Sequence, residues 1–157
     1  MKSTDVPQVR RDAEESFGAG LYCAESVLLA VARAQGIESE WLPKIATGFC
    51  GGMSRTCGPC GALTGGVMAI GLVLGRNGPK APVQDCYAPI QKLVRDFEAE
   101  FGARDCDRLL GCDLGTAQGQ LLFRVNGLRE RCVRYTGRAA EMAAQLIHES
   151  QEAKRAG

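Results

Sequence analysis

Apolar residues recur at helical spacing along almost the whole chain. In residues 82–101 the large apolar side chains are three or four positions apart, and a similar stripe runs through residues 128–153. Spacing of this kind predicts amphipathic helices with one buried face. No segment alternates apolar and polar residues as a half-buried strand does. The pattern therefore predicts an all-α fold.

Glycine, proline and capping residues divide this pattern into segments. The expected helical segments are about 5–17, 21–35, 39–45, 59–75, 82–101, 106–110, 115–124 and 128–153. A Gly-rich loop carrying the C-G-P-C sequence (57–60) is expected before the fourth of them. No repeat or Pro- or Ser-rich linker divides the chain, so we expect one helical domain over residues 1–157. It is predicted to be a bundle of about six to seven helices, frayed at residues 1–4 and 154–157.

Composition narrows the chemistry to sulfur. The chain has 157 residues, eight of them Cys and one His, with a formal net charge of +1. A net charge that small gives no electrostatic steering of nucleic acid towards the protein. A catalytic triad or a Cys–His pair would have to use His148. Eight cysteines exceed what packing alone requires, so they are the candidate functional residues.

The expected compartment is the cytoplasm. The N-terminal residues are polar without the apolar core of a secretory signal, and the longest apolar stretch, 62–74, is too short to span a bilayer. In a reducing compartment, cysteines indicate metal, cluster or redox chemistry more than a disulfide framework.

Four cysteines share a position relative to the predicted helices. Cys23, Cys60, Cys106 and Cys132 each fall in or beside a first helical turn. Free N–H groups and the helix dipole at that position stabilise a thiolate, and we expect them to lower its pKa. Four thiolates are the usual ligand set of an iron–sulfur cluster or a structural zinc ion. The alternative is that these cysteines pack as small apolar residues.

The C-G-P-C sequence supports a second hypothesis. Cys57 and Cys60 have the spacing of the dithiol in disulfide oxidoreductases. A thioredoxin-like fold would require a strand before the motif, and none is expected. Gly61 follows Cys60, so the C-x-x-C-H sequence of a c-type haem site is absent. No second C-x-x-C exists, which weakens a zinc-ribbon interpretation.

Glycines and arginines leave further alternatives open. Gly61, Gly65 and Gly66 fall inside a predicted helix, where they indicate close packing between helices or approach of the backbone to a cofactor. Five arginines form a basic stretch that is either a solvated helix face or a docking patch for an acidic partner. They are Arg124, Arg129, Arg131, Arg134 and Arg138.

The sequences around the four helix-start cysteines are similar to a known family. YCAESVLLA contains Cys23, GFCGGM precedes CGALTGGVMAIGL at Cys60, DCDRLLG contains Cys106, and RCVRYTGRAAEMAAQLI contains Cys132. Over residues 15–150 the chain resembles the C_GCAxxG_C_C family of small redox-active proteins, whose hallmarks are four cysteines and a C-G-A-x-x-G motif. These four residues match the family's cysteines.

The resemblance implies a cofactor and partners. The family is related to a domain of the split-Soret cytochromes, dimeric proteins in which an iron–sulfur centre accompanies haem. It therefore implies an iron–sulfur cluster, with [2Fe-2S] as one candidate, and a homodimer; haem is not implied. Cys50, Cys57, Cys86 and Cys112 exceed the four-cysteine pattern and leave open a ligand exchange, a larger cluster or an auxiliary dithiol. Cys57 and Cys112 are the first choices as substitute ligands.

The leading hypothesis is an electron carrier with Cys23, Cys60, Cys106 and Cys132 as ligands of an iron–sulfur cluster. It would act with a redox partner protein, without nucleic acid and without a membrane span. A thiol–disulfide or sulfur-transfer enzyme using Cys57 and Cys60 is the second hypothesis. A structural zinc protein with four cysteine ligands is the third.

Overall fold

The chain folds into a bundle of α-helices. The structure, a computed structural model, describes residues 4–157, and these contain nine helices and no strand. The expected fraying at the N-terminus concerns mainly residues 1–3, which lie outside the described residues. The helices are α1 (Val6–Gly18), α2 (Cys23–Ala34), α3 (Trp41–Thr47), α4 (Cys50–Arg55), α5 (Gly61–Leu74), α6 (Gln84–Phe101), α7 (Cys106–Leu110), α8 (Ala117–Val125) and α9 (Arg129–Ala156).

The predicted all-α class is confirmed, and the number of helices is larger than predicted. The expected segments 39–45 and 106–110 correspond to the short helices α3 and α7, and α4 is the helix that no expected segment covers. Its six residues carry little apolar periodicity, so the sequence pattern does not reveal it. Within residues 4–157, no helix is both long enough and apolar enough to cross a membrane.

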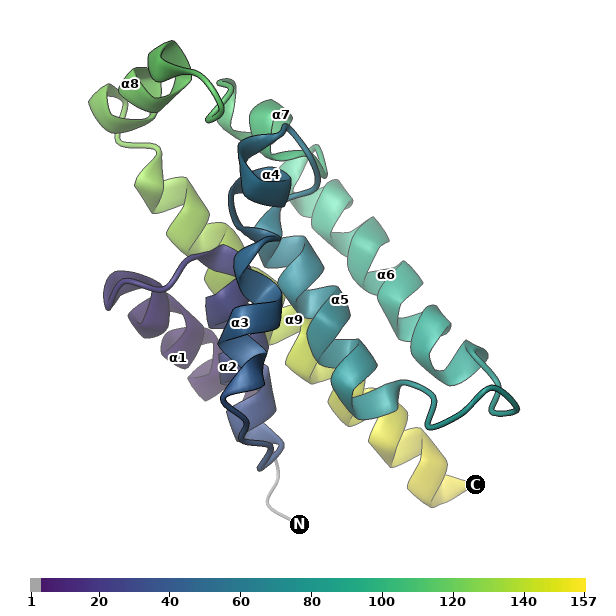
Figure 1. Cartoon of the computed structure of the whole chain (residues 1–157). Helices are drawn as coiled ribbons and strands as arrows, with labels where there is room; N and C mark the ends of the chain where they lie inside the picture. The colour runs from purple at the N-terminus through teal and green to yellow at the C-terminus, as the bar shows by residue number, and fades with distance from the viewer. Residues whose placement is uncertain (1–3) are drawn as a thin grey trace.

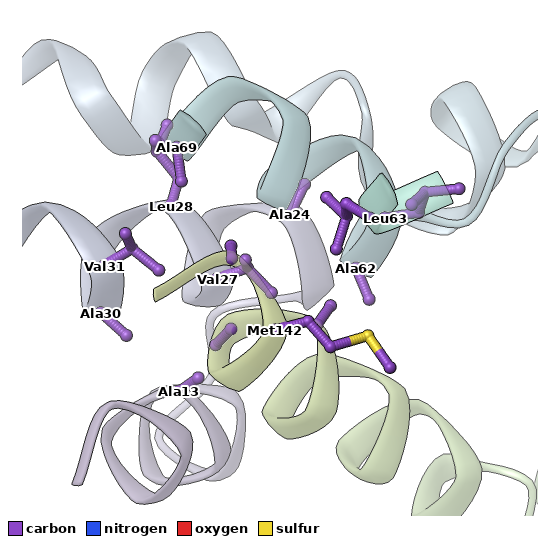
Figure 2. Packing of buried hydrophobic residues seen from close by; sticks show 14 of the residues in the cluster. Ala13, Ala24, Val27, Leu28, Ala30, Val31, Ala62, Leu63, Ala69 and Met142 are labelled. Carbon is purple, nitrogen blue, oxygen red and sulfur yellow. The ribbon is translucent and has the colours of Figure 1, made fainter. Parts of the chain in front are cut away.

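Helices α2, α5 and α9 form the centre of the bundle. They pack on one another, while α1 covers α9 and α2, and α6 covers α5 and α9 (Figure 1). The residues between them are mostly small, as the alanines and valines of α2 show in Figure 2. Gly65 of α5 illustrates the closeness, since a Cβ added there would lie 2.8 Å from the carbonyl oxygen of Ala24. Of the two explanations for this glycine, the structure supports close helix packing.

The expected Gly-rich loop has a more defined conformation than the sequence suggests. Residues 50–55 are helical in their hydrogen bonding, but Gly51, Gly52, Met53 and Ser54 have φ between 59° and 71°. Arg55 and Cys57 also have positive φ. The segment is therefore a left-handed turn, and α5 begins at Gly61 rather than at Pro59.

Candidate functional site

The beginnings of several helices meet at one end of the bundle. There α4 and α7 lie side by side, next to the start of α5 (Figure 1). Cys23 is the first residue of α2, Cys60 is the N-cap of α5, and Cys106 is the first residue of α7. Cys132 lies in the first turn of α9. All four predicted cysteines thus have the helix-start position expected from the sequence.

Backbone hydrogen bonds connect the starts of α5 and α7. The N–H of Cys60 donates to the carbonyl of Arg104 at 2.7 Å, and the N–H of Cys106 donates to the carbonyl of Gly58 at 2.9 Å. Between these bonds, Pro59 and Asp105 form an isolated antiparallel bridge. The bridge holds Cys60 and Cys106 next to each other, although they are 46 residues apart in the sequence.

A close approach of glycine brings Cys23 to the same place. A Cβ added to Gly61 would overlap the Sγ of Cys23 and lie 3.0 Å from the carbonyl oxygen of Phe49. Only hydrogen at this position leaves room for the thiol beside the first turn of α5. Gly61 thus serves the cysteine site, whereas Gly65 serves the packing of α2 on α5.

Electrostatic interactions connect the thiols to one another. The charge of Cys132 raises the pKa of Cys60, and the charge of Cys60 raises the pKa of Cys106. Cys106 in turn raises the pKa of Cys132. The structure thus brings the predicted cysteines into one cluster, with Cys23 joined to it through Gly61 and Cys50.

Three of the four surplus cysteines belong to the same region. Cys50 interacts with Cys23, while Cys57 and Cys112 interact with Cys106. The fourth, Cys86, is buried in the first turn of α6, at the far end of that helix from α7. A helix rises about 1.5 Å per residue, so the 15 residues from Cys86 to Phe101 span roughly 22 Å. Cys86 is therefore separate from the thiol cluster.

For Cys60, Cys106 and Cys132, the expected lowering of the thiol pKa does not occur. Burial raises the pKa of Cys60, Cys106 and Cys132 to about 12 each. Hydrogen bonds from the backbone of Ala62 and Leu63 lower the pKa of Cys60, as expected at a helix start, but by less than burial raises it. Removal from water destabilises the thiolate by more than the free N–H groups stabilise it. Without a bound cation, these thiols are protonated at neutral pH.

A buried carboxylate also contacts the cluster, and the sequence interpretation missed it. The thiol of Cys50 donates to Glu25 Oε1 at 3.5 Å, the Thr47 hydroxyl donates to Glu25 Oε2 at 3.2 Å, and the N–H of Tyr22 donates to Oε1 at 3.1 Å. Glu25 is only 8% exposed. Its position three residues after the N-cap is a recognisable capping pattern, but nothing in the sequence indicates the contact with Cys50. The hydrogen bond to Cys23 and burial together raise the pKa of Cys50.

The environment of Cys57 differs from that of a reactive dithiol. Partial desolvation and a hydrogen bond to Asp113 raise its pKa, as do the charges of Asp107 and Asp105. The pKa of both C-G-P-C thiols is therefore raised, whereas an attacking thiol needs a lowered one. All eight cysteines are free thiols.

A pocket of about 450 Å³ opens beside the cluster. Cys23, Cys50 and Cys132 line one side of it, and Arg55, Arg124 and Arg129 also line it. The five arginines of the basic stretch thus have different surroundings. Arg138 pairs with Glu100 and Glu141, and Arg134 lies over the ring of Phe101, while Arg124 and Arg129 face this pocket.

The described part of the chain contains no ready site for a single metal ion. Within residues 4–157, no three Cys, His, Asp or Glu side chains are grouped so that they could hold one. The thiols are neighbours from separate helices rather than a set directed at one point.

Comparison with known proteins identifies the family. The model of the family described as "Putative redox-active protein (C_GCAxxG_C_C)" matches residues 21–146. The chain belongs to the C_GCAxxG_C_C family. The match contains all eight cysteines, including the four at the helix starts. No curated protein and no solved structure matches the chain. Membership confirms the resemblance found in the sequence and supports a redox role for the chain.

Proposed function

We propose that this C_GCAxxG_C_C protein is a small iron–sulfur protein that carries electrons, with Cys23, Cys60, Cys106 and Cys132 as the cluster ligands. One observation carries the proposal: the first turns of α2, α5, α7 and α9 meet, and each supplies one thiol. That the protein belongs to a redox-active family rests on the family match.

The donor set fits such a cofactor chemically. Thiolates are soft ligands that select iron–sulfur clusters and zinc over hard cations, and four is the usual number. A cluster with four thiolates is anionic, and N–H groups at helix starts stabilise negative charge. When bound, the cluster supplies reversible one-electron oxidation and reduction. The residues of this chain hold it, surround it with apolar atoms and limit its contact with water.

The raised pKa values are compatible with this proposal. A bound metal deprotonates a coordinating thiol outright, so binding displaces the protons that burial retains. The same direction of shift disfavours the dithiol hypothesis, because Cys57 and Cys60 are not activated as nucleophiles.

Zinc is the less suitable metal for this arrangement. Structural zinc sites with four cysteines usually draw their ligands from two closely spaced cysteine pairs, and this sequence has one C-x-x-C. The other proposed ligands, Cys23, Cys106 and Cys132, are far apart in the sequence.

The expected partners belong to the same proposal. An electron carrier exchanges electrons with a redox partner protein, and we propose this role rather than that of an enzyme. The family relationship also implies a second copy of the chain. The compartment proposed for both copies is the cytoplasm, where thiols stay reduced. The exposed apolar side chains of Leu121, Leu122 and Val125 on α8 offer a contact surface near the site.

The experiment is anaerobic purification of the full chain, followed by measurement of iron and acid-labile sulfide. We expect both in a fixed ratio to protein, with a visible absorption band that bleaches on reduction and an EPR signal in one oxidation state. A colourless protein without iron after reconstitution with ferrous iron and sulfide would contradict the proposal. One zinc ion per chain with no redox change would support the structural zinc protein instead.

A further inference from the structure

The pocket beside the thiol cluster has the lining of a small-molecule site. Its volume of about 450 Å³ lies in the range of ligand pockets, roughly 300–1,000 Å³. Cys23, Cys50 and Cys132 form its sulfur side, so a bound molecule lies next to the proposed redox centre. The cluster proposal uses two of these thiols, Cys23 and Cys132, and assigns no occupant to the space between them and the rest of the lining.

The charged side chains of the pocket are all positive. Arg55, Arg124 and Arg129 line it, and no carboxylate does. Within residues 4–157, neither Arg55 nor Arg124 forms an ion pair with Asp or Glu. The three come from α4, the end of α8 and the start of α9. Three guanidinium groups around one hollow favour an anion.

One of these arginines has a fixed position. The Arg129 guanidinium donates to the carbonyl of Phe17 at 3.4 Å and lies 5.1 Å from the centre of the Phe17 ring. The Glu25 carboxylate lies behind the lining, where it accepts hydrogen bonds from Tyr22, Thr47 and Cys50, which themselves line the pocket. Its single negative charge offsets one of the three positive charges, so the surroundings of the pocket keep a net positive charge.

The rest of the lining contains aromatic and apolar side chains together with the polar residues Thr47, Ser54 and Gln120. Phe17 and Tyr22 meet edge to face, with ring centres 6.3 Å apart, and Phe123 and Leu114 complete the wall. Aromatic rings of this kind favour a flat apolar body over a small inorganic ion. The pocket therefore combines recognition of an apolar group with recognition of a negative charge.

We propose that this pocket binds a small organic anion, a carboxylate or sulfonate on an aromatic or similarly flat apolar body. Arg55 and Arg124 bind the charged group, and Phe17, Tyr22 and Phe123 contact the body. The role of the bound molecule rests on the proposed function, because the inference names the class of molecule that reaches the redox centre. Binding itself requires no cluster.

The test uses naphthalene-2-sulfonate as the probe and neutral naphthalene-2-sulfonamide as its uncharged match. Isothermal titration calorimetry of the reduced full chain, metal-free and reconstituted, gives both dissociation constants. We expect the sulfonate to bind about tenfold tighter than the sulfonamide, with an affinity that falls as salt rises. In Arg55→Gln/Arg124→Gln, the sulfonate should bind about tenfold more weakly and the sulfonamide as before.

Two control variants make the result specific. Arg95→Gln removes an exposed positive charge from α6, outside the pocket, and should change neither constant. Phe123→Ala should weaken both probes, because both use the aromatic wall. Equal binding of the two probes, no binding of the sulfonate, or unchanged binding in the double arginine variant would overturn the inference.

The outcomes separate this inference from the cluster proposal. Sulfonate binding by a chain that takes up no iron would uphold the pocket and contradict the proposed function. Iron loading without sulfonate binding would uphold the proposed function and contradict the pocket inference.

Discussion

At the scale of single residues, Gly61 shows how the chain makes room for sulfur. Its missing side chain leaves the space that the Sγ of Cys23 occupies, beside the N-cap residue Cys60. Gly71, two turns or more along the same helix, has nothing within 4 Å of an added Cβ. Two glycines of one helix thus allow the effect of a methyl group on the site to be separated from its effect on helix propensity.

We predict opposite effects for alanine at these two positions. Gly61→Ala should displace Cys23, lower the free energy of unfolding by about 1–3 kcal/mol through overpacking, and reduce iron retention. Gly71→Ala should leave iron retention unchanged and raise the free energy of unfolding by up to about 1 kcal/mol. Urea unfolding and iron analysis of both variants measure this. Full iron retention in Gly61→Ala would show that Cys23 does not depend on this contact.

The identity of the clustered cysteines was predictable to a large extent from the sequence. Capping and glycine signals locate the helix starts, and Cys23, Cys60, Cys106 and Cys132 lie at them in the structure. The direction of their pKa values was not predictable, because it depends on burial, which local sequence does not give. The contact of Glu25 with Cys50 and the arginine-lined pocket arise only when distant elements meet.

At the scale of elements, α4 departs most from what its sequence suggests. Met53, Ser54 and Arg55 have φ between 59° and 67° without being glycine. A left-handed residue other than glycine costs about 1–2 kcal/mol. The Ser54 hydroxyl donates to the Gly48 carbonyl at 2.8 Å, and the N–H groups of Thr56 and Gly58 donate to the Gly52 carbonyl. These hydrogen bonds lie within the left-handed turn, and they offset part of the strain of its non-glycine residues.

Gly51 and Gly52 give a matched test of this turn. Both have φ near +70°, but an added Cβ at Gly52 would lie 2.5 Å from the Cβ of Cys106, whereas at Gly51 it meets only the flexible Arg55 side chain at 3.3 Å. Gly51→Ala should lower the free energy of unfolding by about 1–2 kcal/mol. Gly52→Ala should add about 1–3 kcal/mol of overpacking to that loss. Equal urea midpoints for the two variants would mean that α4 does not pack tightly on α7.

At the scale of the whole molecule, the cysteine site sits at one end of the bundle and affects the stability of the entire fold. Buried thiols with a pKa of about 12 retain their protons in the folded state when unfolded thiols, with an ordinary value of 9.0, have lost them. The stability they contribute is complete below pH 9 and is lost as the pH rises towards 12. The fold class, by contrast, follows from helical periodicity and was predictable throughout.

The metal-free protein should therefore become less stable in alkali. Between pH 9 and 11, each such thiol should lower the free energy of unfolding by about 1.4 kcal/mol per pH unit. Urea unfolding at pH 7, 9 and 10.5 measures the slope. Cys106→Ala should show a slope smaller by the share of one thiol, and an identical slope in that variant would mean that Cys106 is not protonated by burial.

Cys86, in the first turn of α6, is the cysteine that lies away from the thiol cluster. Asp85, its neighbour, pairs with Lys154 near the end of α9, whereas Cys132 is in the first turn of that helix. Cys60→Ser and Cys86→Ser thus remove a thiol from opposite ends of the bundle. Circular dichroism establishes that both variants retain their helices.

The most direct measurement is iron and acid-labile sulfide per chain in these two variants and the unchanged protein, after anaerobic reconstitution. If the helix-start thiols hold a cluster, Cys86→Ser should match the unchanged protein, and Cys60→Ser should lose most of its iron and sulfide or show an altered EPR signal. Iron and sulfide content and EPR spectra that are identical in all three would contradict a cluster ligated by Cys60.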